Sequence, residues 1–184
     1  MVLKVRRFAQ APDFEELPVA KLTRFPLEPR EYKPYSQVRV CFDGSGALHL
    51  QLLSFEAKPL PESTMEAVFR FPGGQQALVL ALNALGEFSV RVGQEEFTTR
   101  SAGHYFTGED LQGVYWGGNL CFPGNLLARA FPGFAPLPGS RFQGNFYKFC
   151  QAPQRPHWGS FFPADFSLPR TAAENLGELV VIDY

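Results

Sequence analysis

The stretch "SQVRVCFDGSGALHLQLLSFEA", residues 36–57, has the pattern of two β-strands joined by a tight turn. Val38, Val40 and Phe42 alternate with polar neighbours, which is the period-2 signature of a half-buried strand. The "DGSG" segment at 43–46 supplies the glycines that a hairpin turn favours. This stretch therefore predicts a β-hairpin, and it sets the expectation for the rest of the chain.

Further segments repeat the strand pattern at short spacing, with turn residues between them. They are "TMEAVFRF" (64–71), "QALVLALNAL" (76–85), "GEFSVRVGQEEFTTR" (86–100) and "ENLGELVVIDY" (174–184). The nearly continuous apolar run at 76–85 suits a strand covered on both faces, although a short helix has the same signature. "YWGGNLCFPGNLLARAF" (115–131) predicts an aromatic strand followed by one short helical turn. We predict an all-β fold, a two-sheet antiparallel β-sandwich of jelly-roll or immunoglobulin-like type with little helix.

Composition agrees with this prediction. The 184 residues include 19 Phe, 16 Pro and 17 Gly, and aromatic residues favour sheets whereas Pro and Gly break helices. The length suits one domain, and no linker, charge block or repeat divides the chain, so residues 1–184 are expected to form a single domain. A net charge of −1 argues against nucleic acid or an anionic membrane as partner, and the oligomeric state stays open.

The cysteines and the N-terminal segment bear on the compartment. Cys41, Cys121 and Cys150 are odd in number and form no CxxC pair, which favours three free thiols in a reducing environment. The segment "MVLKVRRFAQAPDFEEL" lacks the apolar core of a secretion signal. From these features we expect a cytoplasmic protein.

Motifs that carry catalysis or metal binding do not stand out. The patterns GxSxG, GxxxxGK[ST], GxGxxG and HExxH are missing, and His49, His104 and His157 lack metal-ligand spacing. A Cys–His pair could be assembled only from distant positions. The Asp43 turn could bind calcium but lacks further acidic ligands, so a plain hairpin turn is favoured and no cofactor is expected.

The most unusual segment is "RFQGNFYKFCQAPQRPHWGSFFPADF", residues 141–166, which is crowded with aromatic rings. Rings on a β scaffold either fill the core or stack on the C–H faces of sugars, with nearby amides, carboxylates and guanidinium groups binding the hydroxyls. Most of the rings must be core, and composition does not separate the remainder.

The order of motifs resembles the family 9 carbohydrate-binding modules, especially the stand-alone family 9-like proteins. "FQGNFYKF" and "PHWGSFFP" are similar to the family's "ANFYKC" and "PHFLSWNP". Upstream, "STMEAVFRFPGG", "LVLALNALGEF", "CFPGNLL" and "FEELPVAKL" follow the family's succession over nearly the whole chain. The resemblance implies a β-sandwich that clamps a sugar between two tryptophans, with a glutamate and several amides adding hydrogen bonds.

Carried over by motif, the resemblance implies a ligand site in this chain. The glutamate falls on Glu66, the stacking residue on Phe161, and the first clamp tryptophan on Leu60, which cannot stack as an indole does. Glu66 and Phe161 are thereby expected to meet in one cleft. The other residues expected at or near the site are the amides Gln143 and Asn145, the rings Tyr147, Trp158 and Phe162, and the guanidinium of Arg141.

The function that these observations favour is non-catalytic binding of a sugar or a saccharide chain end. Two alternatives stay open. A family 9-like domain could have lost sugar binding and could serve another small molecule or a protein partner, or the same cleft could belong to an intracellular enzyme. Haem binding comes last, because only Met65 and the three histidines are available as axial ligands.

Overall fold

A computed structural model describes residues 1–10, 12–27, 33–97 and 103–183. About 49% of these residues lie in strands and 8% in helices, which confirms the predicted all-β fold with little helix. No helix within the described ranges has the length and apolar character needed to span a membrane.

The described parts of the chain contain thirteen strands and three short helices. The strands are β1 (Val2–Arg7), β2 (Ala20–Leu22), β3 (Ser36–Phe42), β4 (Leu48–Phe55), β5 (Thr64–Arg70), β6 (Leu78–Asn83), β7 (Phe88–Val92), β8 (Glu95–Glu96), β9 (Gly103–Asp110), β10 (Gly113–Phe122), β11 (Arg141–Cys150), β12 (His157–Ser160) and β13 (Gly177–Asp183). The helices are η1 (Phe14–Glu16), α1 (Gly124–Ala130) and η2 (Ala173–Asn175).

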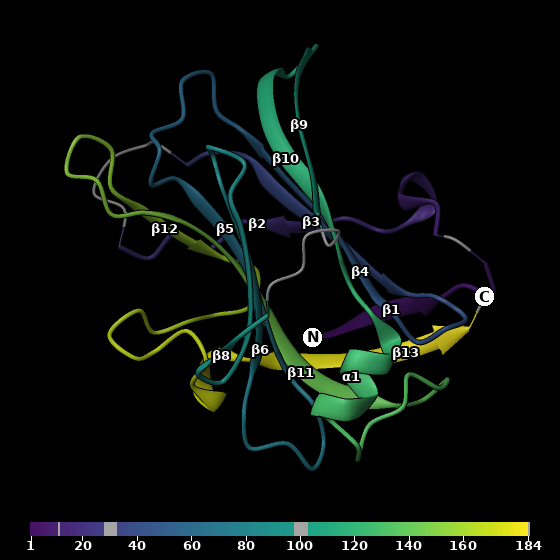
Figure 1. Cartoon of the computed structure of the whole chain (residues 1–184). Helices are drawn as coiled ribbons and strands as arrows, with labels where there is room; N and C mark the ends of the chain where they lie inside the picture. The colour runs from purple at the N-terminus through teal and green to yellow at the C-terminus, as the bar shows by residue number, and fades with distance from the viewer. Residues whose placement is uncertain (11, 28–32, 98–102, 184) are drawn as a thin grey trace.

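The strands form one curled sheet in the order β8-β7-β6-β5-β11-β13-β1-β3-β4-β10-β9, with β2 paired to β3 and β12 to β11. The sheet folds over so that two halves face each other, and β1 and β13 join them along one side (Figure 1). We call β5–β8, β11 and β12 the β5 half, and β2–β4, β9 and β10 the β4 half. The result is sandwich-like, as the sequence predicts.

The pairings of strand β1 are not predicted by the sequence. Strand β1 pairs in parallel with β13 and with β3, whereas the other ladders in the described residues are antiparallel. Lys4, Arg6 and Arg7 interrupt the apolar pattern of this strand, and its partners are the last strand and the third. Local alternation reveals neither partner nor direction, so this closure follows only from the assembled fold.

The core lies between the inner faces of the two halves. Leu48, Leu50 and Leu52 of β4 point inward at every second position and are fully buried. Opposite them, Met65 and Phe69 of β5 are equally buried. Because side chains alternate across a strand, the residues between these positions face outward on both halves.

Most phenylalanines serve this core. The ring centroid of Phe71 lies 4.6 Å from that of Phe134 and 5.2 Å from that of Phe142. Phe131, which ends helix α1, packs against Phe71 at 4.8 Å and closes the same end of the sandwich. Such aromatic contacts add about 0.5–1.5 kcal/mol each to the gain from area burial.

The predicted turn at 43–46 is confirmed in detail. Asp43 Oδ1 accepts hydrogen bonds from the backbone N–H groups of Ser45 and Ala47 at 2.8 and 3.0 Å. Gly46 adopts φ +80°, which side-chain-bearing residues rarely adopt. The Asp43 carboxylate therefore serves the hairpin that the first strand pattern predicts. Within the described residues no group of three or more His, Cys, Asp or Glu side chains could hold a metal ion.

Candidate functional site

Part of the outer face of the β5 half, around Tyr147 and Glu66, is covered by the chain segment 161–176. Asn145 fastens this segment: its Nδ2 donates to the carbonyls of Phe162 and Asn175 at 3.2 and 2.7 Å. Its Oδ1 accepts from the N–H groups of Phe146 and Phe162 at 2.8 and 2.9 Å. The Asn145 side chain is fully buried, so its amide organises the fold.

Glu66 lies on this covered face and already has a partner. Its carboxylate accepts hydrogen bonds from Arg170 Nε at 2.6 Å and from Arg170 Nη2 at 3.2 Å, and Glu66 is only 4% exposed. The same guanidinium lies 4.1 Å from the ring centroid of Phe149. A charge-assisted bidentate pair of this kind is strong, and a sugar hydroxyl would have to compete with it.

The structure does not bring Glu66 and Phe161 together. Phe161 is half-buried and packs against the core ring of Phe146, with centroids 5.9 Å apart. The neighbours of Glu66 in β5, Met65 and Ala67, belong to that core, so Glu66 points to the opposite face of the sheet. The sequence motif identifies the position of Glu66 on its strand, whereas the path of the chain after β12 decides on which face of the sheet Phe161 lies.

Trp158, in contrast, lies on the same side as Glu66. It is half-buried in β12 and pairs across the ladder with Phe149, over which Arg170 stacks. Tyr147 pairs directly with Glu66 across β11 and β5 but is fully buried. Trp158 is therefore the half-exposed candidate ring on the face to which Glu66 points.

The other transferred residues are distributed over the β5 half. Phe162 is 5% exposed and belongs to the core. Arg141 and Gln143 are exposed beside a hollow of about 450 Å³, where Arg141 forms an ion pair with Glu178. Leu60, at the expected clamp position, is half-buried. Their role in ligand binding stays a prediction.

Between the two halves lies a buried polar cluster that sequence reasoning missed. Lys148 Nζ lies 3.1 Å from Glu56 Oε2 and donates to Ser63 Oγ at 2.5 Å. Glu56 Oε2 also accepts from Ser63 Oγ at 2.8 Å and from Trp116 Nε1 at 2.9 Å. Burial raises the pKa of Glu56, but the Lys148 charge and these hydrogen bonds outweigh it and lower that pKa. Glu56 is held as a carboxylate.

His157 completes the cluster as a neutral imidazole. Burial and the neighbouring Lys148 charge lower its pKa to about 4, against the attraction of Glu56. Its Nδ1 lies 3.0 Å from the Arg155 carbonyl, which can only accept, so Nδ1 carries the proton. Its Nε2, 2.7 Å from Lys148 Nζ, then accepts from the ammonium. Burial likewise lowers the pKa of Lys148, opposed by Glu56.

The outer face of the β4 half differs from the covered face, because half-exposed rings lie along it. The carbonyl of Tyr35, just before β3, accepts a hydrogen bond from the Phe55 N–H, and the ring centroids of Tyr35 and Phe55 are 5.5 Å apart. Phe55 pairs across the ladder with Tyr115, again at 5.5 Å, and the Phe106 ring follows 6.4 Å from Tyr115. We call Tyr35, Phe55, Tyr115 and Phe106 the ring row.

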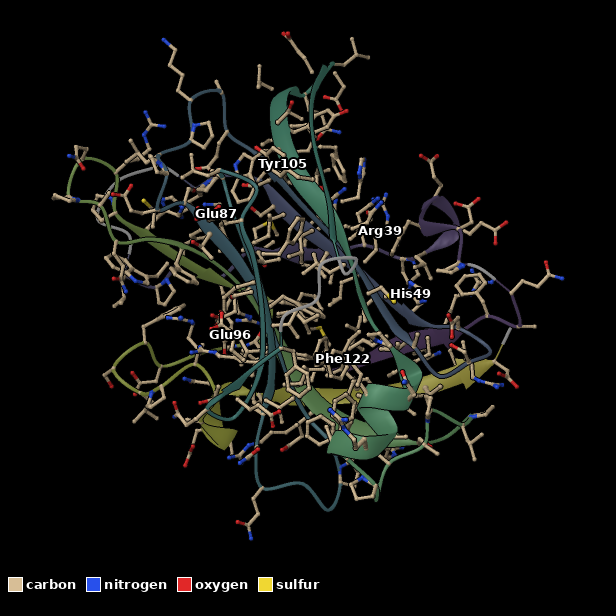
Figure 2. The ribbon with its side chains drawn as sticks, viewed as in Figure 1. Arg39, His49, Glu87, Glu96, Tyr105 and Phe122 are labelled. Atoms are coloured by element: carbon tan, nitrogen blue, oxygen red, sulfur yellow. The ribbon has the colours of Figure 1, made fainter. Side chains whose placement is uncertain are left out.

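A row of two amides and a guanidinium runs beside these rings. Arg39, Gln51 and Asn119 are paired directly across β3, β4 and β10. Arg39 Nη1 donates to Gln51 Oε1 at 2.7 Å, and Gln51 Nε2 donates to Asn119 Oδ1 at 3.2 Å. We call these three residues the amide row. Figure 2 shows Arg39 on the outer side of the ribbon, away from the interior where Phe122 lies.

A hollow of about 360 Å³ joins the two rows. It is lined by three rings of the ring row, Phe55, Phe106 and Tyr115. Its polar lining consists of the amides Gln37, Gln51 and Gln112 and the charged side chains Glu15, Arg39 and Asp110. Rings beside amides and a few charges have the composition of a saccharide-binding surface.

Gly117 makes room for this hollow on β10. A Cβ on Gly117 would come within 2.9 Å of the Phe106 ring and 2.3 Å of the Leu52 carbonyl. The Phe106 ring therefore packs directly on the backbone of Gly117, which adds no side chain to the space between the rings.

Next to the amide row, Cys41, His49 and Cys121 are paired across the same three strands. A nucleophilic cysteine requires a thiolate. Here burial and the Asp43 charge raise the pKa of both thiols, that of Cys41 to about 12, and His49 Nε2 is paired with Asp43 at 2.8 Å. Neither thiol is activated.

The comparisons with known proteins agree with the fold. The chain is similar to a candidate carbohydrate-binding protein from Bacteroides uniformis, with a TM-score of 0.71 and 19% identity over 98% of both chains. It is also similar to a carbohydrate-binding module of family 9 from Caldicellulosiruptor kristjanssonii, solved in complex with cellotriose. There the TM-score is 0.62 with 8% identity, over 98% of this chain and 94% of the other. This chain thus has a family 9-like fold.

Neither sequence comparison adds to this assignment. No family model matches the chain. No curated protein matches it either.

Sequence reasoning missed the face of the β4 half, although a signal was present. In "SQVRVCF" and "LHLQLLSF", Gln37, Arg39 and Gln51 occupy the positions that alternate with the core residues. Amides and a guanidinium at neighbouring outward positions of two paired strands indicate a hydrogen-bonding face. In "GVYWGGN" the sequence offers Tyr115 as a candidate exposed ring, although core packing is favoured there, but it does not place this ring on the β4 half, because the register of Tyr115 against β4 is set by a pairing 60 residues away.

Proposed function

We propose that this protein is a non-catalytic carbohydrate-binding domain and that the saccharide lies on the outer face of the β4 half. One observation carries the proposal: the ring row and the amide row run side by side across the same strands and share a hollow. The family 9-like fold supports a carbohydrate ligand.

The chemistry of the face suits a sugar. Tyr115 and Phe55 offer half-exposed rings for the apolar C–H face of a pyranose. Gln51 and Asn119 offer amide donors and acceptors for its hydroxyls, and their mutual hydrogen bonds hold them in place before the ligand arrives. Side chains ordered in advance lose less entropy on binding.

Binding without catalysis is supported by where the perturbed groups lie. Functional pKa shifts are expected at the walls of a cleft. Glu56, Lys148 and His157, whose pKa values are shifted, lie instead between the sheets with 0–3% exposure. They are suited to holding the fold together.

The second candidate function is a module that binds no sugar and contacts a protein or another small molecule. Two observations favour it: Leu60 stands where the resemblance places a clamp ring, and Arg170 already occupies the Glu66 carboxylate.

Isothermal titration with neutral oligosaccharides separates the two functions. We expect saturable binding to at least one of the cello-, xylo- or manno-hexaoses. The same hexaose in solution should also displace the protein from the immobilised parent polymer. If no hexaose or parent polymer binds at millimolar concentration, the carbohydrate proposal is wrong.

A further inference from the structure

We infer that the outer face of the β4 half binds an internal stretch of a linear, uncharged polysaccharide, with the chain lying across the strands. This inference rests on the proposed function and specifies the ligand of the same site.

The ring row gives the direction. Its first three members come from the lead-in to β3, the end of β4 and the start of β10, so the row crosses strands rather than following one. Neighbouring strands lie ~4.8 Å apart. The centroids of Tyr35, Phe55 and Tyr115 follow at 5.5 and 5.5 Å. Neighbouring ring planes are tilted by 58° and 59°, so the row forms a twisted rather than a flat platform, with one ring for each strand that the saccharide chain crosses.

The amide row adds a second, parallel line of contacts. Arg39, Gln51 and Asn119 cross the same strands at a constant offset of four residues from the ring row on β4 and β10. A chain stacked on the rings therefore presents the hydroxyls of several consecutive units to the amides. A single sugar would use only one ring and one or two polar groups.

The hollow favours an internal stretch because its polar groups are distributed along the face. A site for a chain end needs polar groups that converge on one terminal sugar. Here Gln37 and Gln51 lie on the sheet, whereas Gln112 comes from the β9–β10 turn and Glu15 from η1. The chain can thus enter and leave without meeting a converging set of groups.

The charges of the hollow favour a neutral ligand. Its lining contains the carboxylates Glu15 and Asp110 against the single guanidinium of Arg39, which is already hydrogen-bonded to Gln51. A polyuronate would bring further carboxylates to a lining with more negative than positive groups.

The test uses titration calorimetry with the cello-, xylo- and manno-oligosaccharide series from one to six units. In the series that binds, affinity is expected to rise about tenfold per unit up to three units, the factor that corresponds to 1.4 kcal/mol, and then to level off. Borohydride reduction of the hexaose should leave its affinity within twofold. The parent polymer should bind several protein molecules per chain, and polygalacturonate should bind at least tenfold more weakly than the hexaose.

Each contrary result is distinct. If reduction abolishes binding, if a monosaccharide binds as tightly as the hexaose, or if each polymer chain takes up one protein, the site recognises chain ends. The inference is then wrong while carbohydrate binding stands. Equal or tighter binding of polygalacturonate contradicts the neutral ligand alone. If no saccharide binds, the proposed function fails and the inference with it.

Gln51→Ala supplies the variant arm, with Gln154→Ala, an exposed glutamine of the loop before β12, as matched control. We expect Gln51→Ala to weaken hexaose binding at least fivefold and Gln154→Ala to leave it unchanged. Equal effects of the two substitutions would contradict a role of the amide row.

Discussion

Lys148 of β11 and Glu56, the residue after β4, form an ion pair of 3.1 Å between two fully buried side chains. The pair joins the two halves of the curled sheet, and Trp116 of β10 donates to the same carboxylate. Phe55 and Tyr115 of the ring row are the chain neighbours of Glu56 and Trp116. The buried cluster thus fixes the backbone that presents two of the four rings.

Removing one member of this pair should be severely destabilising. Lys148→Met leaves the Glu56 carboxylate buried without its cation, which costs about 3–5 kcal/mol of unfolding free energy. Arg141→Met, which breaks the exposed Arg141–Glu178 pair, is the matched control and should cost at most ~1 kcal/mol. Urea unfolding of both variants measures the difference, and similar costs would contradict the account of the cluster.

The protein should also lose stability as the pH is lowered through the range in which His157 titrates. Its pKa is about 4 in the folded protein, against ~6.5 in an unfolded chain. The unfolded state therefore binds more protons between these values, and stability decreases as pH falls from ~6.5 to ~4, by up to ~3 kcal/mol. Urea unfolding at a series of pH values detects this loss.

The matching variant for the pH series is His157→Gln, whose amide oxygen can still accept from Lys148. It should flatten the curve between pH 4.5 and 6.5. An unchanged slope in the variant would assign the titration to another group.

Asn145 should prove structural. Asn145→Ala removes a side chain whose amide makes four hydrogen bonds and leaves the carbonyls of Phe162 and Asn175 without this donor. Each buried group left unsatisfied costs about 1–3 kcal/mol. We expect a lower melting temperature with unchanged saccharide affinity per folded molecule, measured by calorimetry. Weakened binding without a loss of stability would place Asn145 in a ligand site.

The substitution Phe161→Ala tests the ligand site that the family resemblance implies. Because its ring packs on Phe146, Phe161→Ala should lower the unfolding free energy by ~1–3 kcal/mol, below the 3–5 kcal/mol of a fully buried ring. Saccharide affinity should not change. A variant with wild-type stability but weaker binding would show that Phe161 is the stacking residue that the family resemblance implies.

Local patterns in the sequence predict part of this fold. Alternation in 36–57 and 64–71 predicts β3, β4 and β5 and their inward faces, because each strand pattern is local. The family motifs predicted the strand position of Glu66, but the expected meeting of Glu66 and Phe161 in one cleft is not found, since Phe161 packs on the opposite face of the sheet. In the cluster of Glu56, Lys148 and His157, Glu56 lies 92 residues before Lys148 and 101 before His157, and no local pattern encodes that convergence.

The comparison of Tyr115→Ala with Trp158→Ala tests the central claim most directly. Both positions hold half-exposed rings, one on the outer face of the β4 half and one on the outer face of the β5 half, to which Glu66 also points. Calorimetric titration with the hexaose that binds the wild type measures the affinity of each folded variant. We predict that Tyr115→Ala weakens binding by ~1–3 kcal/mol, the size of a lost stacking contact, and that Trp158→Ala leaves it unchanged. Loss of binding in Trp158→Ala with wild-type affinity in Tyr115→Ala would contradict the account and return the sugar site to the position beside Glu66.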